Sequence, residues 1–155
     1  MVCHLIHRGL AKHNFKENTL TSFKYCFNKN YGIETDLHCT KDNKIICFHD
    51  FNLKSKFKFN KYINKINYSD LYKISRKGKI PIPLLKDLIE ISKKKHYLML
   101  EIKPLFSTLN LNKLIYETKK LKKYSITSFK EKNLTNLYKI NKNLNLGLVV
   151  PSTWS

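Results

Sequence analysis

Short apolar runs alternate with amphipathic stretches along most of this chain, and that alternation constrains its fold more than any other feature. Strands are predicted at residues 2–6, 32–37, 44–48, 97–103, 125–129 and 146–150, with a tight turn at 41–43 between the second and the third. Helices are predicted between them at 18–28, 83–94, 109–122 and 131–141, where apolar residues recur at helical spacing. Strands that alternate with helices pair in parallel, so the sequence predicts an α/β fold.

The chain has 155 residues without an internal repeat or a proline- or serine-rich linker, which predicts a single domain over 1–155. Its composition is 42% hydrophobic and 12% aromatic, too apolar for a disordered basic tail. No apolar run approaches the ~18 residues that a transmembrane helix needs. Charged residues also begin too early for a signal peptide, so we expect a cytoplasmic protein.

The formal net charge of +19 raises the question of a nucleic-acid partner. Only Arg8 and Arg76 are arginines, whereas readers of nucleic acid depend on arginine for bidentate contacts. We therefore expect no nucleic-acid partner, and a positive field that attracts small phosphorylated anions. Weak contact with an anionic membrane surface stays open. The segment 54–69 mixes aromatic residues with lysines, and a solvated loop folded back on the domain is favoured there over a stacking platform.

Three of the eleven acidic residues are predicted to meet at one point. Glu34 and Asp36 lie two apart on a strand and so point to the same face, and Glu101 lies near the end of a later strand. The carboxyl ends of parallel strands are where α/β folds build active sites. Converging carboxylates repel one another unless they are protonated or bind a cation. Oxygen ligands favour magnesium or calcium over zinc.

Histidines and basic residues fall at the same predicted strand ends. His7 and Arg8 follow the first strand, His49 follows the third, and Lys103 follows Glu101 by two residues. Histidines exchange protons near neutral pH, and cations hold phosphate. Taken singly, each residue could be exposed charge or a structural histidine. Their shared position at the strand ends favours the cleavage of a phosphodiester.

The same residues resemble the glycerophosphodiester phosphodiesterases. The resemblance covers roughly residues 2–150, and its motifs occur in the order of that family. These motifs are His7-Arg8-Gly9, Glu17-Asn18-Thr19, Ile33 to Asp42, Phe48-His49-Asp50, Ile80 to Leu85, Leu100 to Lys103 and Ser128-Phe129. The family is similar to the phosphatidylinositol-specific phospholipases C in being a TIM barrel with a histidine pair.

The resemblance implies a role for each residue. It implies a divalent cation, Mg²⁺ or Ca²⁺, and hydrolysis of a glycerophosphodiester to glycerol 3-phosphate and an alcohol. The implied metal ligands are Glu34, Asp36 and Glu101. The implied acid and base are His7 and His49. The implied substrate-binding residues are Arg8, Lys103 and Glu17, with Glu17 orienting Arg8 or a metal-bound group.

The chain length departs from the family pattern. A TIM barrel takes about 250 residues for eight βα units, so we expect an incomplete barrel of about six units with the last two missing. Three readings then remain: an enzyme, a truncated non-catalytic relative, and a basic binding module for anionic lipid or nucleic acid. The intact motif residues favour the enzyme. A second copy or a partner chain that completes the barrel would satisfy the open edges.

Overall fold

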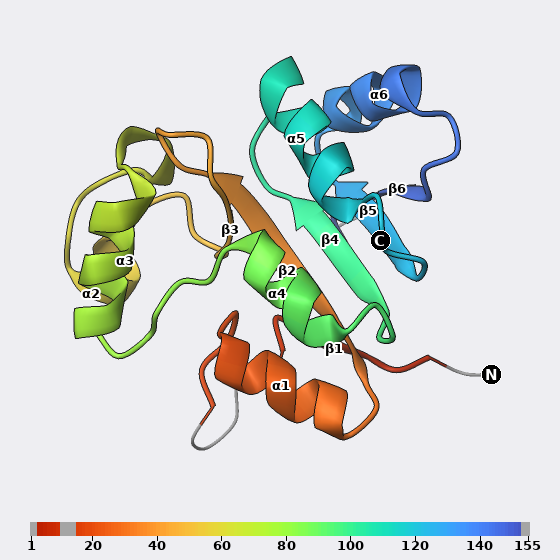
Figure 1. Ribbon diagram of the computed structural model, residues 1–155. Coiled ribbons are helices and arrows are strands. Elements are labelled where there is room, and N and C mark those ends of the chain that lie inside the picture. The colour runs from red at the N-terminus through yellow and green to blue at the C-terminus, as the bar shows by residue number, and fades with distance from the viewer. Residues whose placement is uncertain (1–2, 10–14, 153–155) are drawn as a thin grey trace.

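One six-stranded sheet forms the centre of the computed structural model, which describes residues 3–9 and 15–152 (Figure 1). The strands are β1 (Leu5–His7), β2 (Gly32–Cys39), β3 (Ile45–Cys47), β4 (Leu98–Ile102), β5 (Tyr124–Ser128) and β6 (Leu146–Leu148). Five of them pair in parallel in the order β1-β2-β4-β5-β6. The architecture is therefore an incomplete, TIM-barrel-like α/β fold, as the sequence predicts.

Helices connect these strands. They are α1 (Leu20–Asn28), α2 (Lys54–Phe57), α3 (Tyr68–Lys77), α4 (Leu85–Ser92), α5 (Thr108–Thr118) and α6 (Glu131–Ile140), with a 3₁₀ turn η1 (Ile63–Lys65). The start of α1 is set by a capping box between Thr19 and Ser22, so the helix begins two residues later than predicted. Within the described residues, no helix has the length and apolar character needed to cross a membrane.

The third strand follows the predicted tight turn but lies off the parallel path of the sheet. β3 runs antiparallel to β2, with Cys39 opposite Ile45. The two strands are joined by a short turn in which Asn43 has a left-handed backbone with φ of 58°. A connection this short cannot carry the crossover that parallel pairing requires. The six predicted strands are present, but β3 belongs to a hairpin, and the parallel path contains five strands within the described residues.

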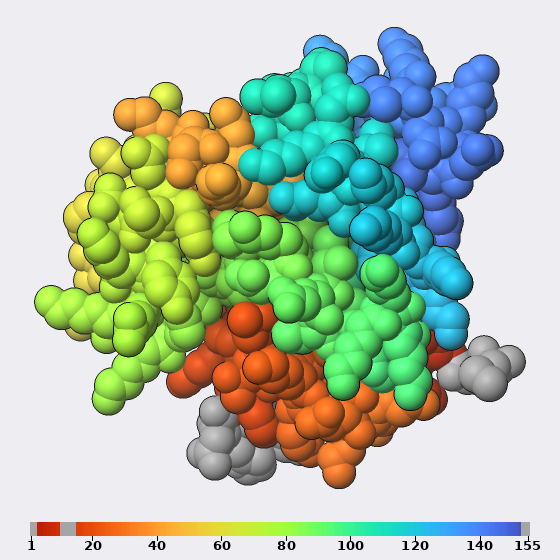
Figure 2. Space-filling view, in the orientation of Figure 1, coloured from red at the N-terminus to blue at the C-terminus, as the bar shows by residue number. Residues whose placement is uncertain are grey.

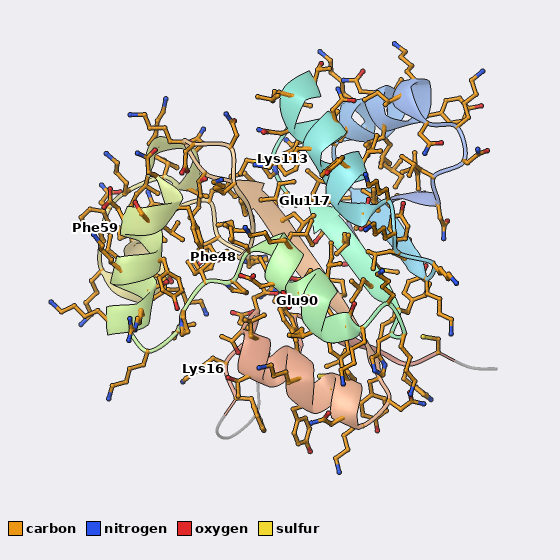
Figure 3. The ribbon with its side chains drawn as sticks, viewed as in Figure 1. Lys16, Phe48, Phe59, Glu90, Lys113 and Glu117 are labelled. Atoms are coloured by element: carbon orange, nitrogen blue, oxygen red, sulfur yellow. The ribbon has the colours of Figure 1, made fainter. Side chains whose placement is uncertain are left out.

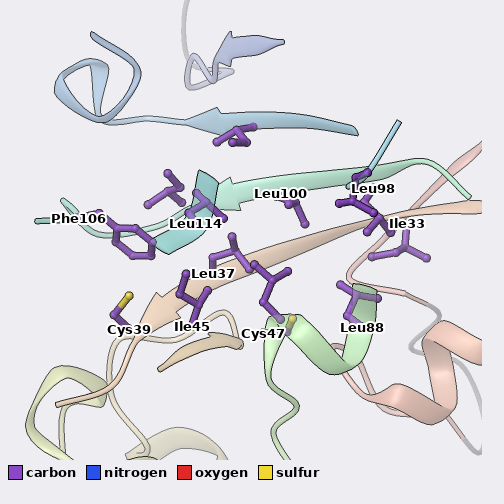
Figure 4. Packing of buried hydrophobic residues seen from close by; sticks show 14 of the residues in the cluster. Ile33, Leu37, Cys39, Ile45, Cys47, Leu88, Leu98, Leu100, Phe106 and Leu114 are labelled. Carbon is purple, nitrogen blue, oxygen red and sulfur yellow. The ribbon is translucent and has the colours of Figure 1, made fainter. Parts of the chain in front are cut away.

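The two faces of the sheet carry different chemistry because side chains alternate along each strand. Ile33 and Leu37 of β2 and Leu98 and Leu100 of β4 are fully buried in one apolar cluster (Figure 4). Helices α1, α4, α5 and α6 all contribute buried residues to this cluster, so we call this side of the sheet the helix face. The alternate residues, Glu34 and Asp36 among them, point to the opposite side, the inner face.

Residues 51–82, between β3 and α4, fold into a small lobe that we call the insert. Its apolar side chains form a second core together with β3. The fully or nearly buried members of that core are Ile46, Phe48, Leu53, Ile63, Ile66, Leu71 and Ile82. Figure 2 shows the insert, coloured yellow to lime, standing beside α4. Figure 3 labels Phe48 where the insert meets the rest of the molecule and Phe59 on the outer side of the insert.

The insert corrects the expectation of a solvated loop at 54–69. Helical turns and a shared apolar core order this segment, and Ile63 is 1% exposed. The aromatic residues divide between the two environments: Phe57 and Tyr68 pack against the core, whereas Phe59 and Tyr62 remain exposed. The sequence of this segment predicts a loop because its apolar residues are separated by lysines and form no continuous helical or strand pattern.

Candidate active site

Three carboxylates meet on the inner face of the sheet. Glu34 and Asp36 lie two apart on β2, and the strand register places Glu101 of β4 directly beside Asp36. One oxygen atom from each carboxylate lies within 4.8 Å of the others. The structure thus brings together the three residues that the sequence predicts to converge.

The carboxylates sit in a strained electrostatic environment. Burial raises the pKa of Glu34 to about 8, and the charges of Asp36 and Glu101 push it in the same direction. Burial, followed by its contact with Asp36, also raises the pKa of Glu101. One oxygen each of Glu34 and Asp36 is buried without a hydrogen-bond partner among the described residues. Buried carboxylate oxygens that accept no hydrogen bond are the kind of donor that a hard divalent cation binds.

Arg8 approaches the carboxylates from a tight turn after β1. Its Nη1 donates a hydrogen bond to Glu17 Oε2 at 2.9 Å, and its Nε lies 3.3 Å from Asp36 Oδ2 without aligning for a hydrogen bond. Arg8 has a left-handed φ of 53° and Gly9 a φ of 68°. A Cβ on Gly9 would lie 2.8 Å from Ser22 Oγ, so the turn requires glycine. The motif therefore fixes where the guanidinium points.

Lys103 lies beside the same carboxylates and lines the same cavity as Arg8. It follows the last residue of β4, and its Nζ lies 3.5 Å from Glu101 Oε2 and 4.0 Å from Asp36 Oδ1. The ammonium also lies over the ring of Phe129, 5.4 Å from the ring centre. Arg8 and Lys103 thus flank the acidic cluster with two cations. An anion beside the carboxylates would meet both of them.

The two predicted histidines border one cavity. His7 is exposed at the end of β1, with Nε2 3.7 Å from Glu34 Oε2. His49 Nδ1 lies 2.8 Å from Asp50 Oδ1, an arrangement that leaves Nε2 for another partner. The cavity has a volume of about 440 Å³. It is lined by His7, Arg8, Glu34, His49, Met99, Glu101, Lys103, Thr127, Phe129 and Val149.

Glu17 connects the insert to the site. Lys56 of α2 donates to Glu17 Oε1 at 2.7 Å, while Arg8 donates to the other oxygen. Burial raises the pKa of Glu17, but the hydrogen bonds from Lys56 and Arg8 outweigh it, so the net shift is downward. The carboxylate is therefore held ionised. The predicted contact of Glu17 with Arg8 is present, and the contact with Lys56 is one that sequence analysis does not provide.

Two further residues support the site without having been predicted. Asn18 donates to Asp36 Oδ2 at 3.2 Å and accepts from Thr35 at 2.7 Å, so it fixes one carboxylate. His38 Nε2 lies 3.0 Å from the main-chain oxygen of His49. Because burial lowers the pKa of His38 to about 4, its ring is neutral near pH 7 and must donate to that carbonyl. The sequence feature that could have identified Asn18 and His38 is their position inside the motifs that contain the site residues.

Several curated proteins are similar to this chain. A glycerophosphodiester phosphodiesterase of Bacillus altitudinis is 28% identical over 104 residues, which cover 62% of this chain and 42% of that protein. A lysophospholipase D of Rattus norvegicus is 32% identical over 101 residues, which cover 56% of this chain and 32% of the relative. The chain thus spans less than half the length of these relatives.

Solved structures show the same fold at low sequence identity. A glycerophosphodiester phosphodiesterase of Thermotoga maritima has a TM-score of 0.81 at 24% identity, covering 99% of this chain and 64% of that one. A phosphodiesterase of Oleispira antarctica, solved with the product sn-glycerol-3-phosphate, has a TM-score of 0.82 at 22% identity, covering 99% and 69%.

Family assignment rests on the whole length of the site-bearing segment. The sequence profile of the glycerophosphoryl diester phosphodiesterase family matches residues 7–151, from the first histidine of the site to a point just past β6. That span contains every carboxylate, cation and histidine described above. The chain belongs to the glycerophosphoryl diester phosphodiesterase family.

Proposed function

We propose that this chain carries the catalytic site of a metal-dependent hydrolase that cleaves glycerophosphodiesters into glycerol 3-phosphate and an alcohol. One observation supports the proposal above the others: three carboxylates converge within 4.8 Å beside two cations. Two histidines border the same cavity. Carboxylates that bind a metal ion, basic side chains that bind phosphate and groups that transfer protons together suit the cleavage of a phosphodiester.

Glu34, Asp36 and Glu101 are the residues that would hold the divalent cation. Their fit to Mg²⁺ or Ca²⁺ rests on oxygen-only donors and on the buried oxygens of Glu34 and Asp36 that accept no hydrogen bond within the described residues. When bound, the cation would polarise a phosphoryl oxygen and offset the repulsion among the carboxylates. Asn18 would hold Asp36 in the orientation that the site requires.

The cations and histidines would act on the substrate directly. Arg8 and Lys103 would bind the phosphate oxygens, each held in place by a carboxylate of the site. One histidine of the pair His7 and His49 would accept the proton of the attacking oxygen, a glycerol hydroxyl or water. The other would donate a proton to the leaving alcohol. Asp50, bound to His49 Nδ1, would keep Nε2 turned toward the reaction.

The relatives supply the substrate class. The Bacillus altitudinis protein is named a glycerophosphodiester phosphodiesterase, and the Oleispira antarctica structure contains sn-glycerol-3-phosphate as product. Lysophospholipids, the substrates named for the Rattus norvegicus relative, are themselves glycerophosphodiesters with an acyl chain. The glycerol 3-phosphate moiety is the part that these substrates share.

An assay for release of glycerol 3-phosphate tests the proposal. The purified chain is incubated with glycerophosphocholine or glycerophosphoethanolamine in Mg²⁺, in Ca²⁺ and in excess chelator. We expect turnover with a divalent cation, none with chelator, and none from the Glu34→Gln variant. Full activity in chelator would contradict the metal mechanism. No turnover of any diester under all conditions would contradict the proposed activity of this chain.

A further inference from the structure

A second cavity adjoins the one that contains the carboxylates. Its volume is about 920 Å³, and it shares His49 and Lys103 with the first cavity. From these two residues it extends over the insert. The remaining residues that line it are Asp50, Phe51, Asn52, Lys54, Ser55, Asn60 and Tyr62.

The shared residues determine which part of a substrate enters the second cavity, provided that the proposed function holds. Glu34 and Glu101 line the first cavity, so the phosphate and the glycerol hydroxyls belong there. A diester that extends past His49 and Lys103 leaves the carboxylates behind and enters the second cavity. The group that occupies this space is therefore the leaving alcohol.

The walls of the second cavity combine exposed aromatic rings with polar hydrogen-bond donors. Phe51 and Tyr62 are 48% and 58% exposed, so part of each ring is accessible to a ligand, although the Phe51 ring also contacts His38 with ring centres 4.8 Å apart. The side chain of Asn52 is already engaged: it donates to Asn60 Oδ1 at 3.0 Å and accepts from the Lys54 main chain at 2.8 Å. Asn60 is therefore left with its NH₂ group as the free end.

The unused polar groups are mostly donors. Within the described part of the chain, the Lys54 ammonium, the Ser55 hydroxyl and the Asn60 NH₂ have no hydrogen-bond partner. Lysine and amide NH₂ groups offer protons only, so their natural partners are oxygen acceptors. A ligand rich in hydroxyl or carboxylate oxygens satisfies these donors. A trimethylammonium group satisfies none of them.

The charge of the cavity points in the same direction. Lys54 contributes a positive charge that has no carboxylate partner within the described residues, whereas Lys103 is paired with Glu101 and Asp36, and Asp50 binds His49. Quaternary ammonium groups are recognised by aromatic faces without competing cations. Here the rings of Phe51 and Tyr62 share the cavity with the unpaired Lys54, whose ammonium repels a cationic alcohol.

We propose that the cavity between His49 and the insert is the subsite for the leaving alcohol, and that it selects oxygen-rich alcohols without a cationic group. Glycerol and cyclic polyols belong to this class. Choline and ethanolamine do not. Lys54 is the specificity-determining residue, because it is the lysine of this cavity that has no carboxylate partner within the described residues.

Relative kcat/KM values test the proposal. Glycerophosphoglycerol and glycerophosphoinositol are compared with glycerophosphocholine at saturating Mg²⁺. We expect the polyol diesters to be favoured about tenfold, and Lys54→Gln to reduce this preference to about threefold. Lys65→Gln removes the same charge from the same insert outside the cavity and should leave the preference unchanged. Equal kcat/KM values, or a preference unaffected by Lys54→Gln, would overturn the proposal.

Calorimetric binding of the same three diesters separates this inference from the proposed function. Tighter binding of the polyol diesters without turnover would contradict the activity and support the subsite. Turnover with equal affinities for all three would support the activity and overturn the subsite. Absence of binding to any diester would overturn both.

Discussion

The two faces of the central sheet differ although the same strands build both. On the helix face, Leu100 is fully buried in an apolar cluster. One residue later, Glu101 turns to the inner face and meets Asp36 and Lys103. The side chains of the helix face are apolar and pack against one another. The inner face contains buried carboxylate oxygens that accept no hydrogen bond within the described residues.

Neighbouring residues of one strand therefore have different roles: one stabilises the fold and the next contributes to the candidate site. Apolar burial on the helix face stabilises the fold. Crowded carboxylates on the inner face oppose it, because burial and like charges both disfavour their ionised forms. Substitutions on the helix face should therefore lower stability, whereas substitutions of the inner-face carboxylates should lower activity without lowering stability.

The largest expected effect is on catalysis. Glu101→Gln removes one of three converging charges, so activity should fall below detection while the melting temperature of the metal-free protein stays equal or rises. Leu100→Ala, its neighbour on the helix face, should cost about 2–5 kcal/mol of unfolding free energy. Activity assays and thermal melts on both variants measure this contrast. A strong loss of stability in metal-free Glu101→Gln would refute the separation of the faces.

The next largest effect compares two histidines. His49→Ala should lower kcat/KM by about 10²–10⁴-fold, because a proton-transfer group is lost. His96 lies before β4, at the opposite end from Glu101, and stacks on Phe27 with ring centres 4.8 Å apart. His96→Ala is the control and should retain near-normal turnover. Comparable losses in both variants would mean that His49 acts through structure rather than proton transfer.

Cation binding should depend on pH through Glu34. Its pKa of about 8 means that a proton occupies the carboxylate below that pH and competes with Mg²⁺. Affinity measured by calorimetry should therefore fall as pH drops from 8.5 to 6.5, by at most about tenfold per unit. Affinity that is constant over this range would contradict the raised pKa.

Stability of the metal-free protein should change with pH in the opposite direction. Unfolded Glu34 loses its proton near its ordinary pKa of 4.5, whereas the folded residue keeps it to about 8. Between these values the folded state binds the extra proton, so unfolding free energy falls as pH rises. Glu34→Gln is the matched control, and its melting temperature should vary less over the same range.

The smallest effect concerns His38, a positioning residue on the inner face. His38→Ala removes the donor to the His49 carbonyl, and we expect about a three- to tenfold loss in kcat with KM little changed. His38→Gln supplies an NH₂ donor and should restore part of the rate. A loss of stability without this kcat effect, and without rescue by glutamine, would assign His38 a purely structural role.

The period of two along β2 predicts from the sequence that Glu34 and Asp36 share the inner face. The sequence likewise predicts the strand ends, where Arg8 and Lys103 follow short apolar runs. The tight turn at 41–43 that joins β2 to β3 is predicted as well, but the count of six barrel strands wrongly includes β3, which pairs antiparallel with β2. The apolar pattern that locates a strand does not encode its direction in the sheet.

The insert and the supporting contacts lay beyond the sequence for another reason. The apolar residues of the insert are scattered, and Ile63 and Leu71 become a core only when the segment folds against Ile46. The bond between Lys56 and Glu17 joins residues 39 apart in the chain. Contacts over such separations follow from the assembled fold, whereas the spacing of residues reports only local structure.

The carboxylate of Glu17 binds two cationic side chains on separate segments. One of its oxygens binds the guanidinium of Arg8 beside the carboxylate cluster, and the other binds Lys56 of the insert. No single second change can compensate for its loss, because the replacement would have to serve two cations on separate segments at once. Salt weakens both bonds together. Rising ionic strength should therefore loosen Arg8, a proposed phosphate-binding residue, and the insert that lines the proposed alcohol subsite at the same time.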